Sequence, residues 1–314
     1  MRRGKKVMLA GAGCIGAGIV LTAAGAMAGG TVGMLLDSSG IHMAGDAREE
    51  AHILEKTELP EFTSADIAID SGDFRLAASD GYYLEYSLDG NHREPEYGVE
   101  NGTFVFSEAS SVNLINLGLA LWETSDAAKN QVTLYVPEMI FEEFALKNSY
   151  GDADLGSLSG KSVKISLESG DLKAETIEAQ DLSVSNSYGD VKIENGKADT
   201  ANLSLESGNL ESGTIETRDL SVSGSYGDLA MENCKAETAD FELESGDAVV
   251  NIAEDIAAYD IELNTESGQI YAPEIGTRTG TDDEEKFRFN AGGEKKLTIS
   301  SSYGDIHLSN IFEK

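Results

Sequence analysis

A glycine followed by an acidic or amide residue recurs every nineteen residues, and this repeat restricts the possible folds more than any other feature. Glycine suits such positions because tight corners often require a positive φ. Gly268 follows after 22 residues and Gly304 after 36, which we interpret as the same period with loop insertions. The six glycines at the regular spacing are Gly151, Gly170, Gly189, Gly208, Gly227 and Gly246.

Apolar residues occupy the same positions in every copy of the repeat. Two of these columns are two residues apart, as on one face of a β-strand, and a second such pair, which begins at Ala153 and Leu155 in the first copy, follows the corner. Each copy is therefore expected to hold two short strands. Parallel stacking of equivalent strands, at about 4.8 Å per coil, predicts an all-β fold with a single β-solenoid. A β-sandwich is the alternative. The two columns are Phe144, Val163, Leu182, Ala201, Leu220 and Ala239, and Leu146, Ile165, Val184, Leu203, Val222 and Phe241.

A second period of 38 residues is superimposed on the first. The corner reads Ser-Tyr-Gly-Asp in one copy and Glu-Ser-Gly-Asp or Glu-Ser-Gly-Asn in the next, and Ser302 to Asp305 repeat the tyrosine version. We expect tyrosine and serine to alternate along one ridge of the solenoid. The alternation of large and small side chains suits packing, and a row of ligand-stacking rings is the alternative. The ridge tyrosines are Tyr150, Tyr188, Tyr226 and Tyr303.

The residue after each corner glycine forms a column of carboxylates, interrupted by Asn209. Stacked like charges repel unless a backbone amide or a cation compensates them. An aspartate that accepts backbone N–H groups of its own corner is one interpretation, and a row of weak Ca²⁺ sites is the other. The candidate metal ligands are Asp152, Asp171, Asp190, Asp228 and Asp247.

The N-terminal segment has the composition of a membrane anchor. Residues 7–36 contain no charge, which is long enough to span a bilayer. The basic residues before this run and the acidic chain after it predict a cytoplasmic N-terminus and an extracytoplasmic remainder. The sequence Ala-Met-Ala at residues 26–28 resembles a cleavage site, so removal as a signal peptide is the alternative to a transmembrane helix.

The remaining organisation follows from where the repeat begins and where it is interrupted. Residues 1–36 are the basic N-terminus and anchor, and residues 37–58 are a polar tether. Residues 59–143 are expected to form divergent first coils and an N-terminal cap, because a solenoid end must cover its exposed strands. Residues 144–314 form the regular solenoid, with a charged loop inserted at 272–296.

Charge and motif content exclude several classes of function. The formal net charge of −33 makes nucleic-acid binding unfavourable. The four histidines are scattered, and no phosphate-binding loop, dinucleotide fingerprint or nucleophile elbow occurs. Carboxylates that repeat in similar surroundings do not supply the distinct acid and base of a hydrolase. We therefore expect no enzyme and no cofactor. Cys234 falls in an apolar column, which predicts a buried small side chain.

Several runs resemble the bacterial putative-adhesin β-strand-repeat domain family. They are the opening at residues 59–63, the strand and corner at 67–73, the strand at 132–136 followed by proline, and the later Ser-x-Gly-Asp corners. The resemblance covers residues 59–312 and implies a cell-envelope protein with an N-terminal membrane segment. It implies no catalytic or binding residues.

Together these features predict a membrane-anchored, extracytoplasmic β-solenoid that acts as a surface-interaction or adhesin-like module, or one associated with envelope stress. Its expected partners are the membrane and an envelope protein or wall polymer. An acidic, Ca²⁺-binding surface scaffold is the second hypothesis, and an enzyme that acts on wall polysaccharide is the third.

Overall fold

The computed structural model describes residues 34–37, 40–43, 51–88, 94–108, 115–117, 130–273, 279–281, 284–290 and 292–311. The chain divides into two compact units. In the smaller unit, the described residues form a three-stranded antiparallel sheet in the order β2-β1-β9. Its strands are β1 (Met34–Asp37), β2 (Gly40–Met43) and β9 (Ile115–Leu117). The larger unit comprises residues 52–88, 94–109 and 129–314.

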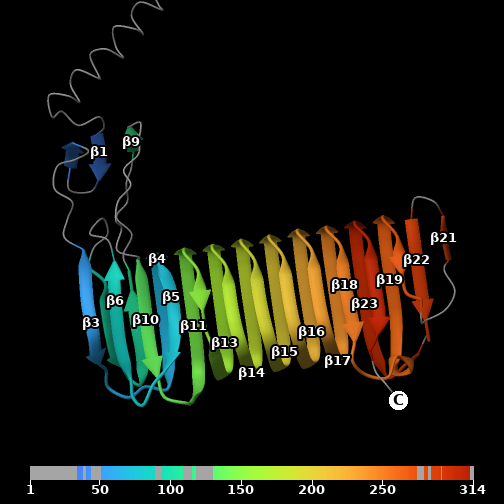
Figure 1. Cartoon of the computed structure of the whole chain (residues 1–314), viewed down its shortest axis with the longest axis horizontal. Coiled ribbons are helices and arrows are strands. Elements are labelled where there is room, and N and C mark those ends of the chain that lie inside the picture. Colours follow the sequence, from blue (N-terminus) through green and yellow to red (C-terminus); the bar gives the residue numbers. More distant parts are fainter. Residues whose placement is uncertain are drawn as a thin grey trace, which may run out of the picture. The chain divides into compact units, whose positions relative to one another are not determined.

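The centre of the larger unit is a regular β-solenoid (Figure 1). Each long strand pairs in parallel with the strand one repeat later, and Leu172 faces Val191 as Leu182 faces Ala201. The apolar columns point inward, and the column from Leu146 to Phe241 is at most 2% exposed. The all-β, solenoid-like fold expected from the repeat is therefore confirmed. These strands are β11 (Ile140–Tyr150), β12 (Ala153–Asp154), β13 (Ser157–Ser169), β14 (Leu172–Tyr188), β15 (Val191–Ser207), β16 (Leu210–Tyr226) and β17 (Leu229–Ser245).

The prediction of two short strands per copy is wrong for the central coils, where a single strand of 17 residues runs from one glycine corner to the next. In β14 the buried residues include Ala174, Ile177 and Leu182, at intervals of three and five that break the alternation of a flat strand. The strand therefore bends twice. Pairing with both neighbouring coils resumes after each bend, and β14 contains no glycine. Cys234 lies at the first bend of β17 and is 1% exposed, as its column predicted.

The N-terminal end of the solenoid combines one more coil with antiparallel strands. In that coil β4 pairs in parallel with β11 and β8, and β5 pairs with β10 and β12. β3 pairs antiparallel with β6, so residues 52–58, expected to be part of a tether, belong to the sheet. The strands are β3 (His52–Glu58), β4 (Ser64–Ser71), β5 (Asp73–Ala78), β6 (Tyr83–Leu88), β7 (Glu96–Glu100), β8 (Thr103–Ser107) and β10 (Gln131–Val136).

At the other end the coils are not stacked in the order of the sequence. The last coil, β23 and β24, lies between β17–β18 on one side and β19–β20 on the other, where Figure 1 shows β23 in red between orange strands. The elements are β18 (Ala248–Ile252), the 3-10 helix η1 (Ile256–Ala258), β19 (Tyr259–Ser267), β20 (Ile270–Tyr271), β21 (Thr279–Thr281), β22 (Glu284–Phe289), β23 (Lys295–Tyr303) and β24 (Ile306–Asn310).

This arrangement corrects two expectations. The 36 residues between Gly268 and Gly304 are not a simple loop insertion in a stack that follows the order of the sequence. The chain first forms the outermost coil, which contains β19, and β23 then pairs between β19 and β17. The segment 272–296 is not only a charged loop, since β22 pairs antiparallel with β19 and with β21. Phe287 of β22 is 4% exposed. This hairpin covers the edge of β19, which would otherwise present unpaired backbone groups.

Most of the predicted membrane anchor lies outside the described residues, which begin at residue 34. Its last three residues, 34–36, form part of β1. Among the residues with described positions, no helix is both long and apolar enough to cross a bilayer.

Candidate functional site

The corner glycines let neighbouring coils approach through their backbones. Seven of the eight predicted corner glycines have φ between +133° and +154°, and Gly268 is the exception. A Cβ on Gly208 would lie 2.0 Å from the carbonyl oxygen of Gly189, and one on Gly268 would lie 2.0 Å from that of Gly304. Close stacking therefore requires glycine even where φ does not.

The aspartate column forms a continuous hydrogen-bonded ladder, which we call the aspartate ladder. The backbone N–H of each member after the first donates to the side-chain Oδ1 of the member on the preceding coil, at 2.8–3.0 Å. The interpretation that each aspartate caps its own corner is therefore wrong, because the bond crosses to the next coil. In spatial order the ladder contains Asp73, Asp152, Asp171, Asp190, Asn209, Asp228, Asp247, Asp305 and Gln269.

The five predicted metal ligands all belong to this ladder, so the structure brings them into one column. One oxygen of each is already bonded to a backbone N–H group. Asn209 performs the same role with its amide oxygen, which accepts from Asp228 N–H at 2.9 Å. Among the described residues, no group of three or more His, Cys, Asp or Glu side chains is placed to hold a metal ion. The geometry of the column is thus explained by inter-coil hydrogen bonds.

The residues before the corner glycines form the tyrosine ridge. The register places Tyr150 between Ser71 and Ser169, and Tyr303 between Ser245 and Ser267. The four ridge tyrosines are 59–64% exposed. In spatial order the ridge reads Ser71, Tyr150, Ser169, Tyr188, Ser207, Tyr226, Ser245, Tyr303 and Ser267.

The inserted last coil keeps this alternation intact. In sequence order Ser245 is followed by Ser267 and then by Tyr303, which would place two serine corners side by side. Insertion of the tyrosine coil between them restores the alternation in space. The rule is therefore obeyed by spatial neighbours, whatever their order along the chain.

A second alternation lies directly beneath the ridge. In coils whose ridge residue is tyrosine, the residue two positions before that tyrosine is small or polar. In three of the coils whose ridge residue is serine, the equivalent residue is leucine. Nδ2 of Asn186 donates to the carbonyl oxygens of Gly170 and Gly189, both at 3.0 Å, and so joins two adjacent corners. Asn148 makes the equivalent pair of bonds. These asparagines lie 38 residues apart in the sequence, and this spacing is the signal by which they could have been predicted.

A polar groove of about 670 Å³ runs beside the ridge. Its lining contains the residues that immediately precede ridge members, alternately serine and glutamate, among them Ser187, Glu206, Ser225 and Glu244. The aspartate ladder runs on the opposite side of the ridge. The exposed tyrosine rings are therefore flanked by carboxylates on both sides.

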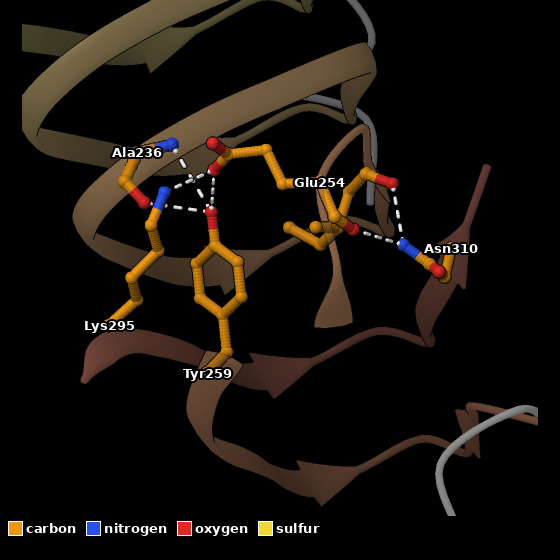
Figure 2. Close-up of polar contacts among 6 residues, drawn as sticks. Ala236, Glu254, Tyr259, Lys295 and Asn310 are labelled. Carbon is orange, nitrogen blue, oxygen red and sulfur yellow. Dashed lines mark hydrogen bonds and ion pairs between the residues drawn. The ribbon is translucent and has the colours of Figure 1, made fainter. Parts of the chain in front are cut away.

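A polar cluster joins the inserted coil to its neighbours, and we call it the clasp (Figure 2). Nζ of Lys295 lies 2.6 Å from Oε2 of Glu254, and the hydroxyl of Tyr259 lies 2.6 Å from the same oxygen. This hydroxyl is also 2.7 Å from the carbonyl oxygen of Ala236. Asn310 Nδ2 donates to the carbonyl oxygen of Glu254 at 2.7 Å. The clasp thus links β17, β19, β23 and the end of β24.

The ionisation of the clasp follows from these contacts. Burial alone would raise the pKa of Glu254, but hydrogen bonds from Lys295 and Tyr259 outweigh it, and the pKa lies below its ordinary value. Burial, followed by the hydrogen bond to Glu254, raises the pKa of Tyr259. An ionised carboxylate therefore sits between an ammonium and a neutral phenol, and its role is to hold the last coil in place. The clasp could not be predicted from the repeat, because Glu254, Tyr259 and Lys295 belong to none of its apolar or corner columns.

Solved structures that resemble the chain come from several bacteria. A putative adhesin from Bacteroides fragilis is 18% identical, with 84% of this chain and 98% of that chain covered and a TM-score of 0.40. A putative lipid binding protein from Parabacteroides distasonis is 13% identical, with 83% and 97% covered and a TM-score of 0.44. A putative adhesin from the same species is also 13% identical, with 85% and 98% covered and a TM-score of 0.39. No match was found among curated proteins.

The family comparison covers nearly the whole larger unit. The matching model is the one described as Toastrack DUF4097, and it extends over residues 61–309, from just before β4 to within one residue of the end of β24. This agrees with the resemblance expected from the opening at residues 59–63 and the repeated corners. The chain therefore belongs to the Toastrack DUF4097 family.

Proposed function

We propose that the chain is a membrane-anchored, extracytoplasmic β-solenoid that acts as a non-catalytic surface-interaction module. The observation that supports this role is the tyrosine ridge, which presents aromatic rings 59–64% exposed at regular intervals along the stack. Exposed aromatic rows are more typical of binding surfaces than of the solvated face of a protein with no partner. The rows of carboxylates repeat with the coils, as suits an extended partner better than a single small molecule.

The location in this proposal rests on the N-terminal sequence. Residues 7–36 carry no charge, four basic residues precede them, and every acidic residue follows them. This distribution favours retention of the basic end in the cytoplasm. The acidic solenoid would then lie outside the membrane.

Labelling of an introduced cysteine on intact cells tests this location. Glu206 is exposed, so a Glu206→Cys variant should react with a membrane-impermeant maleimide without cell lysis. The Cys14→Ser chain is the control and the background for the variant, since its remaining cysteine, Cys234, is 1% exposed and burial raises its pKa to about 12. Labelling of Glu206→Cys that occurs only after lysis would contradict the extracytoplasmic placement.

Photo-cross-linking in living cells tests the interaction. A benzophenone amino acid in place of Tyr188 would lie on the ridge, and one in place of Tyr97 would occupy an exposed position in β7, outside the ridge and the ladder. We expect discrete adducts from position 188 of the full chain and none from position 97. Identical adduct patterns at both positions, or none at 188, would refute the assignment of the ridge as the interaction surface.

A further inference from the structure

We propose that the tyrosine ridge binds an extended basic polypeptide in the polyproline II conformation, with a lysine or arginine at every third residue. This deepens the proposed function, on which it rests, by assigning a class of partner to the same surface. Three properties of the ridge lead to it: the exposure of the rings, the charge beside them and their spacing.

The rings are available for stacking. Tyr150, Tyr188, Tyr226 and Tyr303 are each about three-fifths exposed, and none of their hydroxyls hydrogen-bonds to another described residue. Packing between coils does not explain this exposure, because the neighbouring ridge residue is a serine on each side. A cation placed over a tyrosine ring is attracted by its π-electrons.

The charge beside the rings is mostly negative, although Lys147 pairs with Glu168 at 3.8 Å and Lys286 also lines the groove. The groove side contributes Glu168, Glu206, Glu244 and Glu266, and the other side contributes the aspartate ladder. No lysine or arginine occurs in the ladder or at the positions that immediately precede ridge residues. Such a surface repels anionic polymers and favours a cationic partner. The aromatic faces and the carboxylates therefore suit the same side chains, lysine and arginine.

The spacing of the rings selects the conformation of the partner. Consecutive ridge tyrosines are two coils apart, which corresponds to about 9.6 Å at the usual strand separation of about 4.8 Å. A polyproline II helix rises about 3.1 Å per residue with three residues per turn, so equivalent side chains recur every ~9.3 Å. A β-strand would present side chains on one face every ~6.8 Å and lose register within two tyrosines. One side chain from each of four successive polyproline II turns can therefore lie over each of the four tyrosine rings.

Peptide binding to the purified full chain in detergent micelles tests the proposal. The probe is a fluorescein-labelled peptide of four Lys-Pro-Pro units, and its control has the same composition with the four lysines placed consecutively. We expect the periodic peptide to bind at least ten-fold more tightly than the control, with an affinity that falls as salt is added. The neutral polysaccharide hydroxyethylcellulose, tested in competition, should not displace it.

Variants assign the binding to the ridge. Tyr188→Ser combined with Tyr226→Ser copies the residue of the adjacent coils, so the fold should be retained, and we expect at least ten-fold weaker binding. The matched control is Tyr97→Ser, an exposed tyrosine of β7 that belongs to neither the ridge nor the ladder, which should bind as the native chain does. Glu206→Gln with Glu244→Gln should weaken binding several-fold at low salt and reduce its salt dependence.

Three results would overturn the proposal: equal affinity for the two peptides, equal affinity of the ridge and control variants, or displacement by the polysaccharide. The first would leave only non-specific charge attraction, and the last would indicate a sugar polymer as partner. If cross-links form at position 188 in cells while the periodic peptide fails to bind, the proposed function stands and this inference fails.

Discussion

The corner glycines allow a quantitative test of how tightly the coils are stacked. In a Gly208→Ala variant the new Cβ would lie 2.0 Å from the carbonyl oxygen of Gly189 and 2.6 Å from its carbonyl carbon. Carbon and oxygen atoms in close C–H···O contacts are about 3.3 Å apart, so the two coils would have to separate by more than ~1 Å at this corner. The atoms in conflict belong to the backbone, so a change of rotamer cannot relieve the overlap.

The expected cost has two parts. The φ of +136° at Gly208 is unfavourable for a residue with a side chain, and such strain costs about 1–3 kcal/mol. The separation would also break the bonds from Asn209 N–H to Asp190 Oδ1 and from Val191 N–H to Asn209 O, both 2.8 Å. Each is worth about 0.5–1.5 kcal/mol. We therefore expect Gly208→Ala to lower the free energy of unfolding by about 2–6 kcal/mol.

Urea unfolding of the full chain, followed by far-UV circular dichroism, measures this loss. The matched control is Gly98→Ala, where a Cβ would meet no atom within 4 Å, and its stability should stay within about 1 kcal/mol of the native chain. Because a solenoid weakened in the middle loses cooperativity, new proteolytic cleavage near residue 208 is also expected. If the two alanine variants unfold at the same urea concentration, the close backbone stacking described above is incorrect.

Three further predictions concern the ladder, the clasp and the buried thiol. Asp171→Ala should lower the free energy of unfolding in urea by about 0.5–1.5 kcal/mol, because the hydrogen bond that its side chain accepts in the ladder is lost. Asp171→Asn should be close to neutral, because Asn209 already accepts the equivalent bond. Equal losses in the two variants would contradict the ladder. The pKa of Glu254 is lowered, so the stabilisation that its carboxylate contributes is complete above the ordinary pKa of 4.5 and is lost as the pH falls through the folded-state value. The melting temperatures of the native chain and of Glu254→Gln should therefore differ at about pH 7 and converge in acid. A difference that stays constant with pH would refute the role of the ionised carboxylate. In a Cys14→Ser chain, Cys234, with its pKa raised to about 12 by burial, should react with a thiol reagent at about pH 8 only after urea unfolding. Rapid reaction of this folded chain would place Cys234 at the surface.

The strand pairing inside the solenoid could be predicted because the repeat shows which residues occupy equivalent positions in successive coils. Residues at equivalent positions, such as Leu182 and Ala201, must occupy the same face when units stack in register, and the apolar columns fix which face is inside. The corner glycines could likewise be assigned, since the chain cannot turn and stack at those positions with a side chain present. In this region the local sequence pattern and the contacts between coils both determine the same strand pairing.

The order of the last coils could not be predicted in the same way. The repeat predicts that Gly268 and Gly304 lie at corners, but it does not determine which coils are neighbours in the stack. That choice depends on contacts between residues that no repeat relates, such as Lys295 with Glu254, and on the hairpin that covers β19. The residues that position the ridge were thus visible in the sequence, whereas the residues that decide its final order were not.

The inserted coil also bears on why tyrosine and serine alternate. If the alternation were only a remnant of a duplicated 38-residue unit, it would follow the order of the chain and would fail where that order is broken. It instead holds across the break, where Tyr303 separates Ser245 from Ser267. The ladder and the corner-to-corner bonds follow the same spatial order, with Asp305 N–H donating to Asp247 and the hydroxyl of Thr265 donating to the carbonyl of Gly304. A regular ring spacing is therefore a property of the assembled surface, which is the level at which a binding partner would act on it.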